Sequence, residues 1–175
     1  YDQAILSLET AIKTFPFYKD APTAQQMIVA CYVIKKKYAE ANREREHLVD
    51  NYYQNSEWAK RNSSDKAAIA NAVNEVKRAL GQIAIYYHAE AQKKKKKDLF
   101  EKALSRYNEF FTKFPDDAWR TYEYKYNVAE IYNELKNYEK AAECYDYVAS
   151  RDLSTFPEYK PEEDDTLGLD DEEKE

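Results

Sequence analysis

The feature that most constrains this chain is an aromatic residue followed three places later by alanine, which recurs four times. The four segments open at Tyr1, Tyr38, Phe100 and Tyr138, so they are 37, 62 and 38 residues apart. Down each segment the apolar residues continue in steps of three and four. This stride keeps side chains on one face of an α-helix, so the pattern predicts repeated amphipathic helices.

Two of the four segments keep this frame from end to end and close on an aromatic-proline pair. The first reads Tyr1, Ala4, Leu8, Ala11, Phe15, and the third reads Phe100, Ala103, Tyr107, Phe110, Phe114. The proline that follows each stops the helix, because it lacks a backbone donor and clashes with the preceding turn. The last segment follows the same face at Tyr138, Ala141, Tyr145 and Val148. In the second segment Arg45 interrupts the frame, and it either snorkels at an edge or marks a contact that the other segments lack.

A second apolar-striped stretch precedes each of these helices except the first, so each unit is predicted to be a helical hairpin. Only two glycines and five prolines punctuate the chain, which favours long helices over a fold with many tight turns. We predict helices at about 1–15, 22–37, 38–53, 65–94, 98–114, 118–136 and 138–151. The elongated helix at about 65–94 fills the 62-residue interval, after a polar loop at 54–65. Gly81 in that helix is expected to serve a close helix contact.

The formal charge of −6 is concentrated in the last residues of the chain. From Glu158 to Glu175 there are ten acidic residues against two lysines, which leaves the rest of the chain slightly basic. Residues 158–175 are therefore predicted to be a flexible acidic tail. No run approaches the ~20 apolar residues of a transmembrane helix. The chain begins at Tyr1 without a charged-then-apolar leader, so it stays open whether a signal peptide has been removed.

Histidines and cysteines are few and scattered, and the abundant carboxylates form no recognisable catalytic pair. His47 and His88 lie near no nucleophile and form no metal motif, and we expect them at solvent or groove positions. Cys31 and Cys144 stand alone and read as small buried helix residues, with a disulfide between them left open. No glycine-rich phosphate loop is present. The sequence thus indicates no enzyme, no cofactor and no metal.

One strong basic feature, the run Lys93, Lys94, Lys95, Lys96, Lys97, follows the predicted long helix. It reads first as the solvated end of that helix, where cations favour the C-terminal dipole. The sharper interpretation is a docking site for an acidic partner. Nucleic acid is the least favoured partner, because no basic stripe with interleaved aromatics accompanies the run.

The order of helix, short turn and Tyr-x-x-Ala helix, with aromatic-proline ends, resembles the tetratricopeptide repeat family over roughly residues 1–152. The likeness is strongest to cell-envelope members of the BamD and CpoB type. It rests on residues 114–118 (FPDDA), 126–132 (YNVAEIY), 138–142 (YEKAA) and 52–59 (YYQNSEWA). Two features depart from the family: the 62-residue interval, and the missing lysine and asparagine set that clamps a partner's terminal carboxylate, of which Asn127 alone is present.

The resemblance implies a right-handed solenoid of antiparallel helix pairs over residues 1–157. It implies a non-catalytic scaffold that binds a partner peptide or helix in a groove. Such a scaffold would belong to a multiprotein complex, for example one that takes part in outer-membrane assembly on the periplasmic side of the cell envelope. We expect the groove wall to include Glu123, Tyr126, Asn127, Glu130 and Asn133, which flank the core stripe of their helix. The alternative is a structural spacer of a longer solenoid, since the first Tyr-x-x-Ala helix exposes an apolar face.

Overall fold

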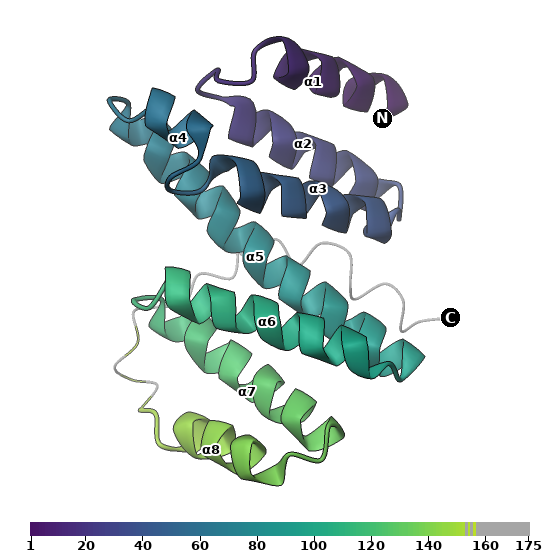
Figure 1. Ribbon diagram of the computed structural model, residues 1–175, viewed down its shortest axis with the longest axis vertical. Coiled ribbons are helices and arrows are strands. Elements are labelled where there is room, and N and C mark those ends of the chain that lie inside the picture. Colours follow the sequence, from purple (N-terminus) through teal and green to yellow (C-terminus); the bar gives the residue numbers. More distant parts are fainter. Residues whose placement is uncertain (153, 155, 157–175) are drawn as a thin grey trace. The chain divides into compact units, whose positions relative to one another are not determined.

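The computed structural model describes residues 1–152, 154 and 156, and over these residues it is all helical, without strands (Figure 1). The helices are α1 (Asp2–Thr14), α2 (Ala21–Ile34), α3 (Tyr38–Tyr52), α4 (Glu57–Arg61), α5 (Lys66–Lys94), α6 (Lys97–Lys113), α7 (Ala118–Glu134) and α8 (Tyr138–Ala149). The predicted acidic tail at 158–175 lies outside the described residues. The fold class is therefore all-α.

The chain divides into two compact units, and the division falls inside α5. The first unit is Tyr1–Ile83, and the second begins at Ala84. We describe each unit by itself.

The prediction of a loop at 54–65 is wrong in part, because this segment contains the short helix α4. Ser56 begins α4 by accepting a hydrogen bond from the backbone N–H of Ala59 at 3.1 Å. The buried Trp58 donates its indole N–H to the carbonyl oxygen of Tyr18 at 2.8 Å and meets the Tyr52 ring edge-on at 5.7 Å. An apolar anchor with one hydrogen bond to satisfy thus fixes α4 onto the α1–α2 connection.

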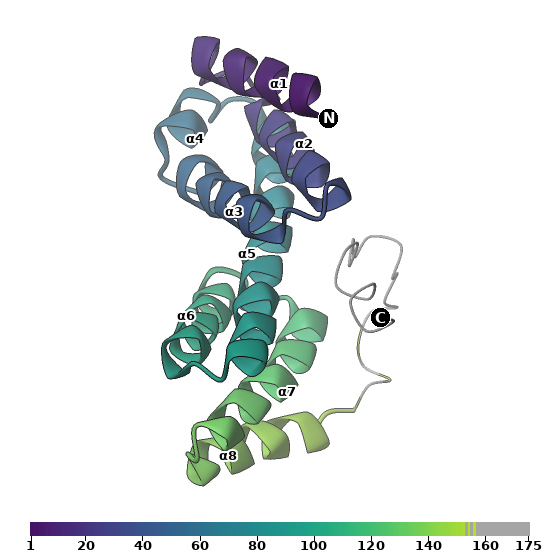
Figure 2. The same cartoon turned by 90° about the vertical axis from the view of Figure 1, so that its right-hand side faces the viewer.

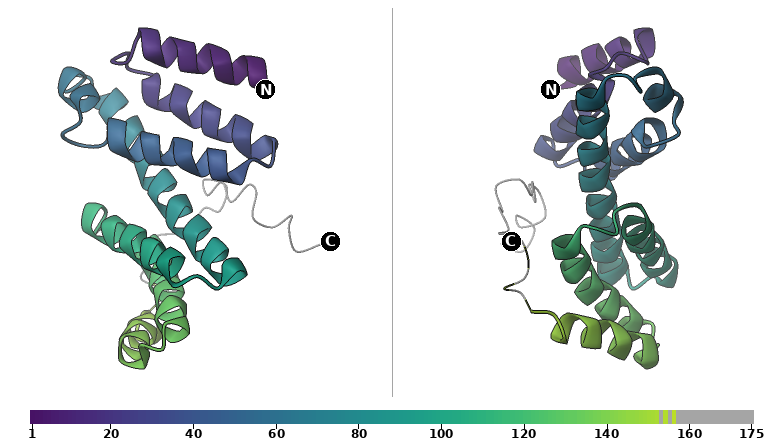
Figure 3. Two further views of the ribbon diagram at one scale, coloured as in Figure 1. Left: turned by 45° about the vertical axis from the view of Figure 1, so that its right-hand side comes forward. Right: turned by 90° about the vertical axis from the view of Figure 1, so that its left-hand side faces the viewer.

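In the first unit α1, α2 and α3 lie side by side (Figure 3), and most of the buried apolar residues come from α2, α3 and the part of α5 that belongs to this unit. Ile28 and Val29 of α2 and Leu48 and Val49 of α3 are buried. Arg45 is also buried, with 8% of its surface exposed, and its Nε donates to Oε1 of Gln82 in α5 at 2.8 Å. Of the two interpretations of Arg45, the structure therefore shows the contact. Gly81, next to Gln82, is buried as well.

In the second unit the core is the aromatic stripe of α6, to which α7 adds Tyr124. The Tyr124 ring lies 5.2 Å from the Tyr107 ring and 4.9 Å from the Phe110 ring, in tilted and edge-to-face contacts. Phe114 adds a further ring 5.3 Å from Phe110. α8 lies against α7, with Ala141 buried (Figure 2).

The recurring aromatic-alanine frame is buried only in part, which corrects the expectation that all its positions face a helix interface. In α6 every position of the frame is buried. In α1 Tyr1 is 64% exposed and Phe15 is 66% exposed, and in α8 Tyr138 is 63% exposed. The physical reason is that the α6 stripe contacts both α5 and α7, whereas α1 and α8 each pack on one neighbouring helix of their own unit.

Two of the hairpin turns are built alike and use lysine where glycine is usual. Lys36 and Lys136 have positive φ angles of 55° and 58°. The N–H of Lys136 donates to Asn133 O at 2.9 Å, and the N–H of Asn137 donates to Tyr132 O at 2.8 Å. The same pair of bonds recurs around Lys36, so both turns are Schellman motifs. Each places a residue with a side chain in the left-handed region, which costs roughly 1–2 kcal/mol.

We therefore expect Lys136→Gly to raise the free energy of unfolding by about 0.5–1 kcal/mol, because relief of the left-handed strain exceeds the added freedom of the unfolded chain. Urea denaturation measures the change. The matched control is Lys140→Gly inside α8, which should lower stability by about 1 kcal/mol. Equal losses from the two substitutions would contradict the turn assignment.

Candidate functional site

The five residues predicted to bind a partner lie along α7 with a helical stride that places them on one side of the helix. Tyr126 is 47% exposed and Asn133 is exposed. Glu123, Asn127 and Glu130 are half-buried. The structure thus brings an aromatic ring, two amides and two carboxylates onto one partly solvated surface, which we call the α7 face.

Asn127 is hydrogen-bonded to a buried residue of α6. Its Nδ2 donates to the Tyr107 hydroxyl oxygen at 3.2 Å, and Tyr107 is fully buried. Burial raises the pKa of Tyr107 well above its ordinary value, so the hydroxyl stays neutral and accepts the bond. The Asn127 amide therefore has a fixed orientation, with its remaining groups turned to the half-exposed side.

The ring of Tyr126 contacts a tyrosine of α8. Its ring meets the Tyr145 ring edge-on, with 5.8 Å between centroids and 71° between planes. Burial, followed by the nearby charge of Glu130, raises the pKa of Tyr145. The Tyr145 phenol is thus uncharged at neutral pH, and the two rings form an amphipathic pair beside a carboxylate. The frame assigned Tyr145 to the core, so the sequence did not indicate its place beside Tyr126.

The lysine run forms the connection between α5 and α6 and is exposed throughout. Lys95 has a positive φ of 51°, and Lys96 precedes the first turn of α6. Lys94 pairs with Glu90, which raises the pKa of Lys94, and Lys97 lies 3.5 Å from Glu101. Two of the five charges therefore have glutamate partners within their own helices. The run is less available to an acidic partner than its sequence suggests.

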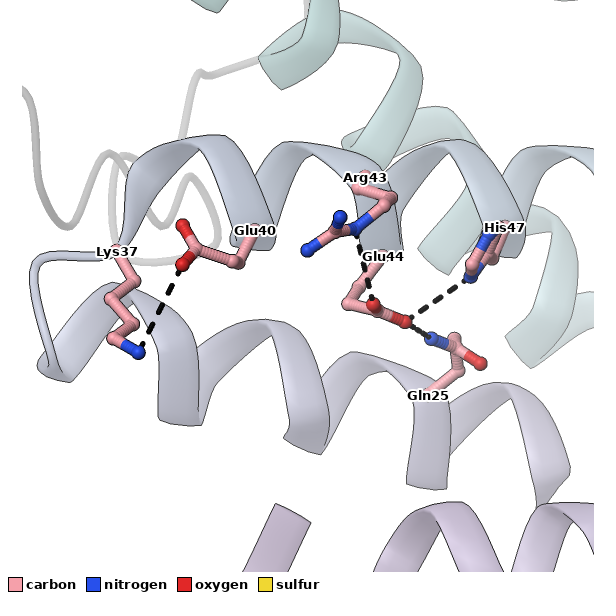
Figure 4. A network of polar contacts seen from close by, with 6 residues as sticks. All are labelled: Gln25, Lys37, Glu40, Arg43, Glu44 and His47. Carbon is pink, nitrogen blue, oxygen red and sulfur yellow. Dashed lines mark hydrogen bonds and ion pairs between the residues drawn. The ribbon is translucent and has the colours of Figure 1, made fainter. Parts of the chain in front are cut away.

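A polar network links α2 and α3 in the first unit (Figure 4). The buried Gln25 donates from Nε2 to Glu44 Oε2 at 2.9 Å, and the same oxygen lies 3.2 Å from Nδ1 of His47. Arg43 Nε lies 4.0 Å from the other Glu44 oxygen. This arrangement ties two helices together around a single carboxylate.

His88 departs from the expected solvent or groove position, because only 7% of its surface is exposed. Its ring lies 6.2 Å from the Phe100 ring, and its Nε2 has no hydrogen-bond partner among the described residues. Burial lowers the pKa of His88, although Glu134 acts in the opposite direction. His88 is therefore a neutral core histidine.

The two cysteines are free thiols. Cys144 is buried and Cys31 half-buried, so the sequence-based expectation of burial is met more fully by the first. Burial raises the pKa of Cys144, which keeps the thiol protonated and poorly reactive. Over the described part of the chain, no helix combines the length and the apolar character needed to cross a membrane.

Comparisons of the chain with protein-family models, with curated proteins and with solved structures find no match.

The burial of His88 predicts an acid-sensitive fold. Below about pH 6.5 the unfolded chain binds a proton on this residue while the folded chain does not, so the free energy of unfolding falls with pH until the lowered folded pKa is reached. At pH values well above about 6.5, His88 contributes no pH dependence to the free energy of unfolding. Urea titrations from pH 7.5 to 5 should show that the unsubstituted chain loses more stability on acidification than His88→Gln does. Parallel pH curves for the two proteins would refute the prediction.

Proposed function

We propose that this chain is a non-catalytic scaffold, a tetratricopeptide-like solenoid that binds a peptide or helix of a partner protein on the α7 face. The observation that carries the proposal is the arrangement around Tyr126, a half-exposed ring supported edge-on by Tyr145. Beside it stands Asn127, oriented by its bond to Tyr107. An aromatic ring and an amide held in place before binding lose little side-chain freedom when a partner docks.

The chemistry of the α7 face suits an extended backbone or a helix surface. Tyrosine offers ring area together with a hydroxyl, and an asparagine amide can both donate to and accept from a peptide group. Glu123 and Glu130 add acceptors for donors on the partner. The short turn at Lys136 brings α8 back against α7, which is the hairpin unit that tetratricopeptide-like arrays repeat. These features together support the solenoid interpretation.

An acidic partner at the lysine run is the weaker docking proposal. Lys94 and Lys97 pair with Glu90 and Glu101, so an acidic ligand would have to compete with these contacts. We therefore place the principal binding surface on α7.

The scaffold proposal predicts that Tyr126→Ala weakens partner binding about tenfold or more, because truncation of a buried aromatic anchor typically costs more than ~1.4 kcal/mol. The partner is first captured from a cell extract on the immobilised chain and identified by mass spectrometry. Its affinity for each purified variant is then measured by calorimetry. Asn127→Ala should weaken binding as well.

The matched control is Tyr138→Ala, which removes an exposed tyrosine from the start of α8. Binding should be unchanged in this variant, and circular dichroism should show all variants to be equally helical. Unchanged affinity in a chain that carries substitutions at Glu123, Tyr126, Asn127, Glu130 and Asn133 together would sink the assignment of the α7 face.

A further inference from the structure

Among the described residues, five of the ten exposed large apolar side chains lie on α1 or next to it, at its start and in its connection to α2. Tyr1, Phe15 and Tyr18 are 64%, 66% and 58% exposed. Beside them lies a hollow of about 450 Å³ with almost wholly apolar walls. It is lined by Ala11, Ile12, Phe15, Tyr18, Asp20, Ala21 and Ala24. Exposed aromatic rings next to an apolar hollow mark a surface that favours a partner.

The second unit shows what fills the corresponding space. The aromatic-alanine frame places Ala11 where α6 has Phe110. Aligning the two Schellman turns, Lys36 on Lys136, places Ala24 of α2 where α7 has Tyr124. Phe110 and Tyr124 pack edge-to-face with their centroids 4.9 Å apart. The hollow in the first unit is thus the space that two aromatic rings occupy in the second.

The second unit also shows what covers such a stripe. α6 is covered on one side by the second half of α5, where His88 meets Phe100 and the small residues Ala84 and Ala91 are fully buried. Alanines seven residues apart let two helices approach closely. α1 carries alanines with the same spacing, Ala4 and Ala11, and both are exposed. α1 therefore presents an apolar stripe like the one on α6 that α5 covers. Through Ala4 and Ala11, α1 also resembles α5, whose alanines let it pack closely against α6.

The stripe on α1 is suited to contact with an identical stripe. The charged residues of α1 are Asp2, Glu9 and Lys13, and the helical stride places them away from the side that bears Ala4 and Ala11. A two-fold contact through this stripe therefore brings no like charges of α1 together. From these observations we infer that two copies of this chain associate through their α1 faces, and that Phe15 and Tyr18 of each copy fill the hollow of the other.

The backbone that carries these rings is held in place before association. The Tyr18 carbonyl oxygen accepts from the Trp58 indole at 2.8 Å, and the Phe17 carbonyl oxygen accepts from Asn62 Nδ2 at 3.1 Å. The guanidinium of Arg61 lies 4.1 Å from the centre of the Phe17 ring. α4 thus fixes the connection that carries the aromatic residues, so association does not have to order it.

Sedimentation equilibrium of the 175-residue chain, from about 1 μM to about 500 μM, tests the inference. We expect the average mass to rise with concentration toward that of two chains. Phe15→Glu should keep the chain monomeric over this range, because it places a charge in the apolar contact. Ala24→Tyr should do the same by filling the hollow from within, as Tyr124 does in the second unit, and it should leave the helical content unchanged.

The control is Leu6→Glu, which introduces the same charge on the same helix at a residue that is 60% exposed and lies on the opposite side from Phe15. This variant should associate like the unsubstituted chain. A chain that stays monomeric at every concentration would overturn the inference and leave the α1 face to a helix from another source. Association that Phe15→Glu and Ala24→Tyr leave intact, or that Leu6→Glu abolishes equally, would overturn it as well.

Discussion

An aromatic-alanine stripe on a helix has two flanks, and the structure depends on whether both are covered. In α6 they are covered by α5 and α7, and the stripe becomes the core of the second unit. Burial of a large aromatic side chain contributes roughly 1.5–3 kcal/mol, so several such rings on one helix account for much of the stability of a small helical unit. In α1 and α8 one flank stays partly uncovered. The same residue types then become surface, and the surfaces that we assign to binding lie beside these helices.

Polar pairs with one buried member determine which helices meet and in which register. Arg45 with Gln82, Gln25 with Glu44 and Asn127 with Tyr107 each join two different helices, at donor-acceptor distances of 2.8, 2.9 and 3.2 Å. A helix that slipped by one turn would leave these groups buried without partners, at a penalty of about 1–3 kcal/mol each. The apolar stripe brings the helices together, and the polar pairs select one arrangement.

The helices could be predicted from the sequence because their stripes repeat with a helical stride, and α5 begins and ends close to the predicted positions. The short helix α4 could not, because its five residues contain no full period and its stability comes from Trp58 reaching Tyr18 in another part of the chain. The Schellman turns were also not predicted, because lysine replaces the glycine that usually marks them.

The candidate site was predicted in the same uneven way. The residues of the α7 face follow from the helical stride, so their common side could be read from the sequence. The supports of that face, Tyr107 under Asn127 and Tyr145 beside Tyr126, are contacts between helices. A periodic pattern gives the side of a helix on which a residue lies, and it does not give the neighbour that the residue meets there.

Because α5 supplies Lys66–Ile83 to the first unit and Ala84–Lys94 to the second, the unfolding of the two units is coupled through one helix. Helix formation is cooperative, so loss of packing in either unit tends to fray the half of α5 that serves the other. Gly81 stands just before the division and weakens the helix there by about 1 kcal/mol. Fraying that starts at one end of α5 can therefore stop at this glycine, which limits how far local opening spreads along the chain.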